Sequence, residues 1–598
     1  MASTSEAGMR VERLRAWMRR EGLHGMIVPR TDAHQSEDTA EYDNCLKYIT
    51  GFTGSAGMAL ILEDSALIFV DGRYQVQVVD EVDLDLFEIR HLHEEPLPEW
   101  LRENARHDWR IGLNPMLVNV ALFDRLDAAV AERGAVLIEQ DQHAFDEIWI
   151  GRPERPVGPV RSMNVAIAGK SSIDKRKLVA ADLQKAGATV LVETLPDNIA
   201  WLLNVRGSDV AMNPVPHSFL TLDADGRANW FVDRRKLGNR LSDFELDDTA
   251  ISDPELFLGH LAARAPSARA LVDLDFAPKS VHATIAGNGG AIIAATSPLT
   301  IAKARKNATE LQGFRECHLE DGAALTNFLA WVSRELDTRE KSGVPLTEME
   351  AQERLLEFRA ARRGFLEESF MTISAAGSNA AMCHYHSRPE TNAAITRAAP
   401  YLVDSGGQYE NGTTDVTRTL MFGVPTPRMK SAYTAVLKGF IALMSAKFPV
   451  GTFGHQLDAL ARLPLWEIEL DYDHGTGHGV GHNLLIHEYP HRFAKKPNLY
   501  GLEPGNIMTI EPGYYEAGAF GMRVENQVEV VEAGSGFCRF ETLTLAPIDL
   551  TMVNMADLTK RERSWIDDYH ATVFDKLAGL VADQTMPMLT EWTRRREP

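Results

Sequence analysis

An internal repeat in the first half of the chain narrows the possible folds more than any other feature. The strings "REGLHGMIV" (20–28), "YITGFTGSAG" (48–57) and "LIFVDGRY" (67–74) are echoed by "KAGATVLV" (185–192), "WLLNVRGSD" (201–209) and "WFVDRRK" (230–236). Each set leads from an amphipathic helix to a strand, a glycine-containing corner and a strand ending in Val-Asp-x-Arg. Two diverged copies of one α/β unit explain this pattern.

Two boundaries divide the chain further. The segment "GRPERPVGPVR" (151–161) has the Pro and Gly content of a linker. A long helix begins near residues 297–314, and its apolar stripe contains Leu325, Phe328, Leu329 and Val332. After residue 303, helices, strands and glycine-rich turns alternate irregularly, as in α+β units. We therefore predict two α/β domains over residues 1–155 and 156–302, and an α+β domain over 303–598 with a docked C-terminal helix. The apolar face of this helix is predicted to contain Ile566, Tyr569, Val573, Leu577 and Leu580.

Composition excludes several kinds of partner. The formal net charge of −22 disfavours binding to nucleic acid or to an anionic membrane. No apolar run approaches the ~18–20 residues of a transmembrane helix. The four cysteines are far apart in the sequence, which indicates a reducing compartment rather than a disulfide framework. The basic N-terminal segment is interrupted by Glu12 and Glu21, so we predict a first helix rather than a transit peptide, and a cytoplasmic protein.

Acidic residues and histidines stand beside strand-like or glycine-rich sequence at four places. They are "DSGGQYENGTTDVTRT" with Asp404 and Asp415, "HGTGHGVGH" (474–482), "MTIEPGYY" with Glu511, and "RVENQVEVV" with Glu525. Each alone is more simply a turn or a solvated strand end. Together they supply two Asp, one His and two Glu. Because unpaired carboxylates are costly to bury, this set predicts a carboxylate-rich site for two metal ions.

The ligand types limit the metal and the chemistry. Four carboxylates and one imidazole suit manganese and tolerate zinc or cobalt. Two such ions ~3.5–4 Å apart can acidify a bridging water and polarise a carbonyl, which is hydrolase chemistry. A simple hairpin at Asn411-Gly412 would place Asp415 opposite Gln408, about 13 Å along the strand from Asp404. We therefore expect a bulge or a wider turn, at Gly406, Gly407 or Gly412.

The ordered set Asp404, Asp415, His478, Glu511 and Glu525 resembles the metallopeptidases of the pita-bread fold. The phrases quoted above, with "IHEYP", are similar to the aminopeptidase P group of that family, and the likeness covers nearly the whole chain. It implies two creatinase-like N-terminal α/β domains before a pita-bread catalytic domain. It also implies a manganese-dependent enzyme that removes the first residue from peptides beginning Xaa-Pro, and a homodimer.

The resemblance also implies roles for individual residues. Asp404 would chelate one metal, His478 and Glu511 the other, and Asp415 and Glu525 would bridge the two. Glu511 would relay the proton of the bridging water. The family's substrate-positioning histidines correspond to His384, His474 and His487, and Arg523 would fix the ligand cluster from outside.

Two departures and two alternatives accompany this interpretation. Tyr489 replaces the family's usual glycine at the substrate rim, and His386 replaces an apolar residue near His384; we expect His386 not to be a ligand. A prolidase shares the ligand set but prefers dipeptides and normally has one N-terminal domain. A non-catalytic peptide-binding pita-bread protein would lack the ligands, all five of which are present here.

Overall fold

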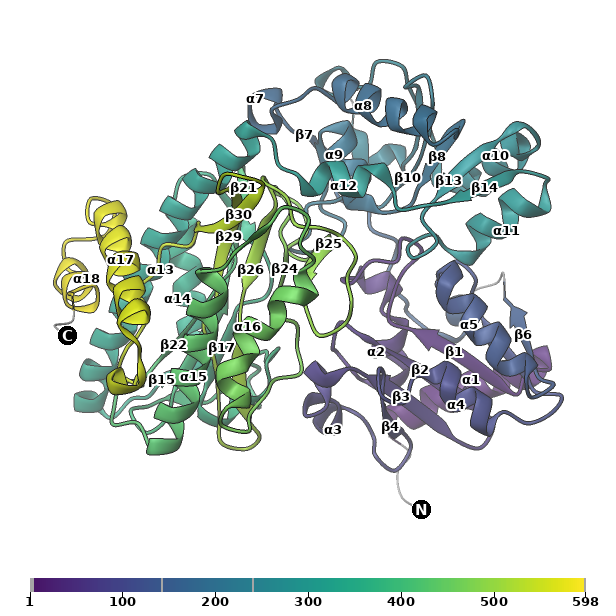
Figure 1. Cartoon of the computed structure of the whole chain (residues 1–598). Coiled ribbons are helices and arrows are strands. Elements are labelled where there is room, and N and C mark those ends of the chain that lie inside the picture. The colour runs from purple at the N-terminus through teal and green to yellow at the C-terminus, as the bar shows by residue number, and fades with distance from the viewer. Residues whose placement is uncertain (1–4, 141–143, 239–240, 596–598) are drawn as a thin grey trace. The chain divides into compact units, whose positions relative to one another are not determined.

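The computed structural model describes residues 5–140, 144–238 and 241–595, which form two compact units (Figure 1). Unit 1 comprises Met1–Val165 and Lys170–Thr300, and unit 2 comprises Ala166–Gly169 and Ile301–Pro598. Unit 1 contains two six-stranded sheets, and unit 2 combines a further six-stranded sheet with several smaller ones. The predicted fold class, α/β followed by α+β, is confirmed.

The first sheet of unit 1 is mixed, and its strand order is β4-β3-β2-β1-β5-β6. Its strands are β1 (Gly25–Pro29), β2 (Gly57–Leu62), β3 (Ala66–Val70), β4 (Glu88–His91), β5 (Arg110–Leu113) and β6 (Val136–Glu139). The helices of this part are α1 (Glu6–Glu21), α2 (Cys45–Thr50), α3 (Gln77–Glu81), α4 (Leu97–Asn104), α5 (Val120–Ala131) and α6 (Ala144–Ile148).

Both faces of this sheet are covered, which explains why its central strands are apolar throughout. Met26 and Val28 of β1 pack with Val11 and other side chains of α1. The alternate residue, Ile27, packs in the other cluster with α4 and α5, which includes Leu101. Because successive side chains of a strand point to opposite faces, a strand buried on both sides reads as a continuous hydrophobic run. The predicted first helix is α1, capped by the Ser5 side chain.

The second sheet of unit 1 repeats this topology with the order β12-β11-β10-β8-β13-β14. Its strands are β8 (Val190–Glu193), β10 (Phe219–Asp223), β11 (Ala228–Phe231), β12 (Thr249–Ser252), β13 (Arg269–Val272) and β14 (Ala291–Ala294). The accompanying helices include α8 (Ser172–Lys185), α9 (Pro196–Leu203), α10 (Phe257–Arg264), α11 (Lys279–Gly287) and α12 (Pro298–Ala304). The echoed strings therefore occupy equivalent strands, β1 with β8 and β3 with β11, as the repeat predicted.

The largest sheet of unit 2 has the order β23-β30-β29-β26-β24-β25. Its strands are β23 (Lys447–Pro449), β24 (Gly477–Gly479), β25 (Glu488–Phe493), β26 (Ile507–Ile510), β29 (Asn526–Glu532) and β30 (Phe537–Thr542). Smaller ladders join β17 (Ile373–Ala376) to β19 (Tyr401–Ser405) and β22 (Val416–Leu420), β16 (Phe365–Glu368) to β20 (Gly407–Tyr409) and β21 (Gly412–Thr413), and β27 (Gly513–Glu516) to β28 (Phe520–Arg523).

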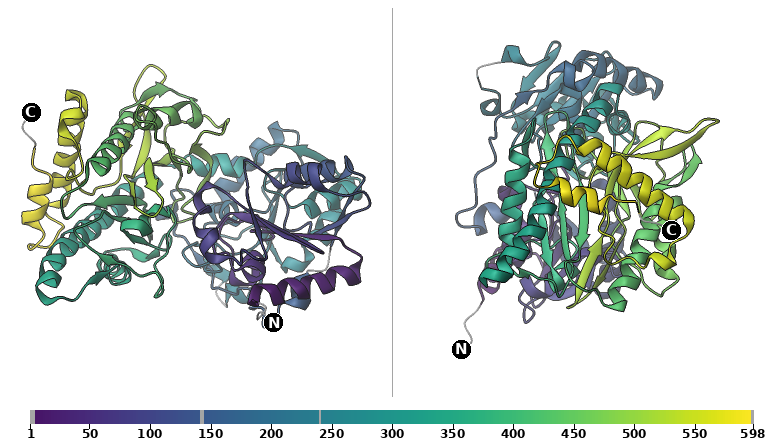
Figure 2. Two further views of the ribbon diagram at one scale, coloured as in Figure 1. Left: turned by 90° about the horizontal axis from the view of Figure 1, so that it is seen from below. Right: turned by 90° about the vertical axis from the view of Figure 1, so that its left-hand side faces the viewer.

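Helices flank these sheets in unit 2, as Figures 1 and 2 show. They are α13 (Ala308–Ser342), α14 (Glu348–Ala360), α15 (Pro427–Met444), α16 (Gly454–Trp466), α17 (Lys560–Leu577) and α18 (Met586–Trp592). The long helix α13 begins at a capping box between Asn307 and Glu310 and ends at Gly343 in the left-handed conformation. Its predicted stripe, from Leu325 to Val332, is buried.

The predicted C-terminal docking is confirmed with one correction. Ile566, Tyr569, Val573 and Leu577 of α17 are buried in the core of unit 2, but Leu580 lies beyond the helix and is 37% exposed. Cys45, Cys317, Cys383 and Cys538 are all buried, and none of these four described residues forms a disulfide bond. Among the described residues, the helices are too short or too polar to cross a membrane.

Candidate metal centre

The Asp404–Asp415 hairpin brings two carboxylates together with a register different from the expected one. Asp404 in β19 pairs with Thr417, and Tyr409 in β20 pairs with Gly412. The turn is therefore formed by residues 410 and 411, one position earlier than expected. Both ladders keep the same register, so the predicted bulge and wider turn are wrong. Asp415 lies across from Gly406, two residues from Asp404 instead of four, which halves the separation along the strand to about 7 Å.

Gly406 is the point at which the paired hairpin is interrupted. The β19–β22 ladder ends at Ser405, and the next ladder begins beyond Gly406. A Cβ atom on Gly406 would lie 1.9 Å from the Thr414 carbonyl oxygen and 2.2 Å from Ser369 Oγ. Only glycine permits this close backbone approach, so one of the three glycines named from the sequence does mark where the ladder gives way.

The other three predicted ligands come from neighbouring strands of the large sheet. His478 is the central residue of β24, which pairs with β26 through Gly479. Glu511 directly follows β26 and Glu525 directly precedes β29, and these strands pair at Ile510 and Asn526. The two glutamates thus flank one cross-strand pair at the same end of the sheet.

Three of the five predicted ligands already have the spacing of a metal site. One atom from each of Asp415, His478 and Glu525 lies within 4.8 Å of the other two. His478 Nε2 is 3.5 Å from Asp415 Oδ2 and 4.0 Å from Glu511 Oε1. His478 Nδ1 is 2.8 Å from the Gly479 carbonyl oxygen, so it carries the proton and donates it there. In this tautomer Nε2 is unprotonated, and its lone pair faces the carboxylates.

Arg523 and Thr417 orient the carboxylates of Asp404 and Glu525 through hydrogen bonds. Arg523 Nη2 donates to Asp404 Oδ2 at 2.5 Å, and Arg523 Nε donates to Thr417 Oγ1 at 3.1 Å. Thr417 Oγ1 in turn donates to Glu525 Oε2 at 2.7 Å. All four side chains are buried. One guanidinium and one hydroxyl therefore orient Asp404 and Glu525, whose ladder positions alone would leave their rotamers free.

The charges of the site do not balance within the chain. Burial raises the pKa of Asp404 and of Glu525, in both cases with a further rise from neighbouring carboxylates. Burial also raises the pKa of Glu511 to about 7. Asp404 Oδ1 and Glu525 Oε1 are buried and accept no hydrogen bond from the described residues. The four carboxylates carry more negative charge than one guanidinium can neutralise, and two of their oxygens lack a hydrogen-bond donor. Both features fit a site that binds divalent cations.

The predicted positioning histidines are arranged at different distances from this cluster. The His487 ring meets the His478 ring edge-on at a centroid separation of 4.4 Å. His474 Nε2 lies 2.8 Å from the Tyr515 hydroxyl, which also accepts a hydrogen bond from Arg523 Nη1. His384 is partly exposed, and the preceding carbonyl, of Cys383, accepts a bond from Arg523 Nη2 at 3.3 Å.

Sequence reasoning missed Thr417 and Tyr515. Thr417 reads as an ordinary β-branched strand residue, and Tyr515 belongs to the quoted string "EPGYY" but carried no expected role. The role of Thr417 arises from its contact with Glu525, which lies 108 positions away in the sequence. The role of Tyr515 arises from its contacts with Arg523, eight positions away, and with His474, 41 positions away. The spacing of acidic residues gives no signal for either.

The fold has two repeated α/β domains before an α+β unit, and its site gathers buried carboxylates around a histidine. This combination defines a metal-dependent hydrolase. Comparison with known families agrees. Residues 312–532 match metallopeptidase family M24 and 536–596 match the C-terminal region of peptidase M24. Residues 10–143 and 151–310 each match the creatinase/prolidase N-terminal domain.

Individual relatives are similar over the full chain. Aminopeptidase P1 of Arabidopsis thaliana is 34% identical, with 96% of each chain covered. A probable Xaa-Pro aminopeptidase P of Talaromyces stipitatus is 37% identical over 99% of this chain and 92% of its own. A crystal structure of X-prolyl aminopeptidase from Caenorhabditis elegans, described as a cytosolic enzyme with a di-nuclear active site, matches with a TM-score of 0.94 at 30% identity, covering 99% and 100%. The chain belongs to the aminopeptidase P group of metallopeptidase family M24, and it is a hydrolase.

Proposed function

We propose that this protein removes the N-terminal residue from peptides with proline in the second position, using two divalent metal ions. The observation that carries the proposal is the convergence of Asp415, His478 and Glu525 within 4.8 Å, beside Asp404 and Glu511. The relatives and the crystal structure described above bear the names aminopeptidase P1, Xaa-Pro aminopeptidase P and X-prolyl aminopeptidase. A dipeptidase from Mycobacterium ulcerans, by contrast, covers only 66% of this chain.

The two ions would be held by the five side chains in the predicted division of roles. Asp404 would hold one ion, His478 and Glu511 would hold the other, and Asp415 and Glu525 would contribute to both. Manganese is the preferred ion because four of the five ligands are carboxylates, with zinc or cobalt as substitutes. Bound ions of this kind supply Lewis acidity and an acidified water.

The remaining residues orient the substrate and move the proton. Glu511 takes the proton of the attacking water on a carboxylate oxygen and returns it to the proline nitrogen as the C–N bond breaks. His384, His474 and His487 position the peptide and stabilise the developing oxyanion. Tyr515 keeps His474 in place through its 2.8 Å contact with Nε2.

Proline chemistry explains why such a site would be specific. A peptide bond before proline is a tertiary amide without N–H, and its ring fixes φ near −65°. Peptidases that recognise an N–H after the scissile bond lose that contact. A site that instead binds the free N-terminus and accepts the ring can act there. Tyr489, whose ring meets Tyr500 at 5.3 Å, stands where the family's rim usually has glycine, so it would shape the choice of peptide.

Mass spectrometry of peptide products tests the proposal. The substrates are Arg-Pro-Pro-type peptides, the dipeptide Arg-Pro, and an Arg-Ala-Pro control, each with manganese or with a chelator. We expect release of arginine from the first only, in a metal-dependent manner, and loss of activity in Glu511→Gln. Preference for Arg-Pro would support a prolidase. No product with any added metal would support a non-catalytic peptide-binding protein.

Three further statements belong to this proposal. The protein is expected to be cytoplasmic and a homodimer, the first supported by the description of the Caenorhabditis elegans enzyme as cytosolic. The domain boundaries at residues 155 and 302 stay predictions. Light scattering of the purified chain would measure its mass in solution, and limited proteolysis would locate the linker near 151–161.

A further inference from the structure

A second cluster of acidic and histidine side chains lies in unit 1, apart from the five predicted ligands. Asp32 follows β1, and Asp43 ends the short helix Glu41–Asp43, so both come from the first repeat. His217 precedes β10 in the second repeat. One ligand atom from each of the three lies within 4.8 Å of the other two. The cluster therefore joins side chains from both α/β repeats at one point.

Two atoms of this cluster are buried and directed at one another without a hydrogen bond. Asp32 is 1% exposed and His217 is 9% exposed. Asp32 Oδ1 accepts the backbone N–H groups of His34 and Ser36, at 2.8 and 3.0 Å. Asp32 Oδ2 and His217 Nε2 form no hydrogen bond with the described residues, and they are 3.4 Å apart.

That separation is typical of two ligands on one metal ion. Ligands at ~2.0–2.1 Å from a tetrahedral centre are about 3.3–3.4 Å apart. Asp43 offers the third donor, and none of the described residues forms a hydrogen bond or an ion pair with its carboxylate. Because Asp43 is partly exposed, an ion bound here can be reached from solvent and can keep a water ligand.

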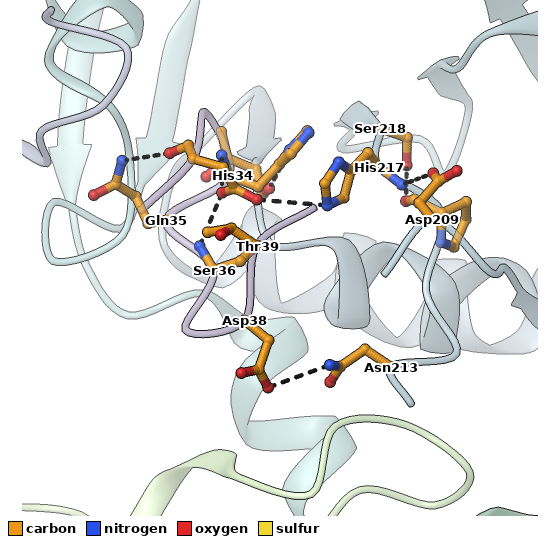
Figure 3. Close-up of polar contacts among 12 residues, drawn as sticks. His34, Gln35, Ser36, Asp38, Thr39, Asp209, Asn213, His217 and Ser218 are labelled. Atoms are coloured by element: carbon orange, nitrogen blue, oxygen red, sulfur yellow. Dashed lines mark hydrogen bonds and ion pairs between the residues drawn. The ribbon is translucent and has the colours of Figure 1, made fainter. Parts of the chain in front are cut away.

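The surroundings of His217 hold its backbone and pack beside its ring. Its backbone N–H donates to Asp209 Oδ2 at 2.7 Å, and Asp209 is paired with Lys236 at 2.6 Å. The His34 ring lies beside the His217 ring (Figure 3), at a centroid distance of 4.7 Å. The Thr194 carbonyl oxygen, 3.2 Å from His34 Nδ1, holds the His34 ring. Neither Asp209 nor His34 competes for His217 Nε2.

The cationic side chains near the cluster have other partners. Arg152, Arg155 and Arg30 act on Asp43 through charge alone. Arg155 lies over the Tyr42 ring. Arg30 donates to the Gly54 carbonyl oxygen at 3.2 Å and to Thr39. Arg152 pairs with Asp146 and donates to the Tyr42 carbonyl oxygen at 2.9 Å. Two carboxylates thus face one imidazole, and no guanidinium or ammonium of the described residues is bound between them.

We propose that Asp32, Asp43 and His217 form a third metal site, which binds a divalent transition ion of the zinc or manganese type. The imidazole ligand disfavours calcium and magnesium, which prefer oxygen donors. The ion joins the two α/β repeats and leaves one coordination position for water. Its function is structural, because it requires both repeats to be folded and correctly placed. The site does not depend on the proposed peptidase activity.

Anomalous diffraction at the absorption edge of zinc tests the site directly. Crystals of the full-length chain equilibrated with zinc should show a peak among Asp32, Asp43 and His217, in addition to the peaks of the catalytic unit. Elemental analysis after dialysis should give one ion per chain more than the catalytic site holds. A direct ion pair between Asp32 and His217 is the competing arrangement. It predicts no peak at this position, and that result would overturn the proposal.

Variants separate this site from the catalytic one. Asp415→Asn combined with Glu525→Gln should still bind one ion per chain, so a failure of the proposed function leaves this test intact. Asp43→Asn and His217→Gln in that background should bind none and lose the zinc-dependent rise in melting temperature. His260→Gln, a partly buried histidine of α10, should bind as the parent does. Equal metal content in Asp43→Asn and its parent would contradict the assignment.

Discussion

The most informative perturbation of the catalytic unit is Thr417→Val. Thr417 is fully buried, and its hydroxyl makes two bonds, donating to Glu525 Oε2 at 2.7 Å and accepting from Arg523 Nε at 3.1 Å. Valine has nearly the same shape but lacks the hydroxyl. The change therefore removes the link between Glu525 and Arg523 and leaves the strand packing of β22 in place.

The expected magnitude follows from these two contacts. Hydrogen bonds to charged groups are worth ~1.5–3 kcal/mol each. Loss of an outer partner of a metal ligand typically weakens metal affinity by ~10–100-fold, or ~1.4–2.8 kcal/mol. We expect a fall in manganese affinity of that size, because Glu525 loses the donor that fixes its orientation. Activity at saturating manganese should recover most of the wild-type value, because all five predicted ligands remain.

The assay is a manganese titration of chelator-treated protein, followed both by calorimetry and by cleavage of an Arg-Pro-Pro peptide. Thr417→Ser keeps the hydroxyl and should titrate close to wild type. Thr434→Val is the matched control, because Thr434 is a buried threonine of α15 whose hydroxyl also makes two bonds, donating to the Lys430 carbonyl oxygen and accepting from the Asn554 N–H at 2.9 Å, neither of which involves a predicted ligand. The reasoning is refuted if Thr417→Val titrates like wild type, or if Thr417→Ser is as weak as Thr417→Val.

Three further predictions address the hairpin, the outer histidine and pH. Gly406→Ala places Cβ 1.9 Å from Thr414 O, so it should lower the melting temperature and abolish activity, whereas Gly259→Ala meets no atom within 4 Å and should be neutral or stabilising. Tyr515→Phe should lower kcat about 10-fold, the value of one hydrogen bond, with KM little changed in steady-state kinetics. Burial lowers the pKa of His491 from 6.5 to about 4, so the unfolded chain binds a proton first as pH falls. The free energy of unfolding should therefore drop by about 2 kcal/mol between pH 7 and 5 from this residue, and urea titrations of His491→Gln should show a correspondingly shallower drop.

The sequence predicts those parts of this protein whose signals are local. The repeated strings identify two equivalent sheets, because the first and last string of each set overlap a sheet strand, β1 and β3 in the first repeat and β8 and β11 in the second. The stripe from Leu325 to Val332 identifies α13, because helical periodicity is visible within two turns. The five candidate ligands are also visible, since acidic residues beside apolar strands are unusual.

Features that depend on long-range contacts could not be predicted in this way. The position of the turn after Tyr409 moves by one residue relative to expectation, and only the pairing of β19 with β22 fixes it. A single-residue shift decides whether Asp415 faces Gly406 or Gln408, and hence whether Asp404 and Asp415 can share a site. Thr417 was missed for the same reason, because its partners lie in another sheet.

The metal centre of unit 2 and the cluster of unit 1 share one feature: a buried carboxylate with one oxygen bound by a donor and the other oxygen without a donor. In unit 2, Arg523 donates to Asp404 Oδ2, and Thr417 donates to Glu525 Oε2. The other oxygens, Asp404 Oδ1 and Glu525 Oε1, are buried and form no hydrogen bond with the described residues. In unit 1, backbone N–H groups satisfy Asp32 Oδ1, and Oδ2 stays bare and faces His217. A carboxylate with one oxygen fixed by donors and the other left without a donor can offer the second oxygen to a cation. In Glu488, which also has one oxygen without a donor, an ion pair with Lys306 supplies the positive charge, and in Asp321 both oxygens are bound by Arg359. The two clusters differ from these structural carboxylates because each gathers several carboxylates and an imidazole around the oxygen that lacks a donor.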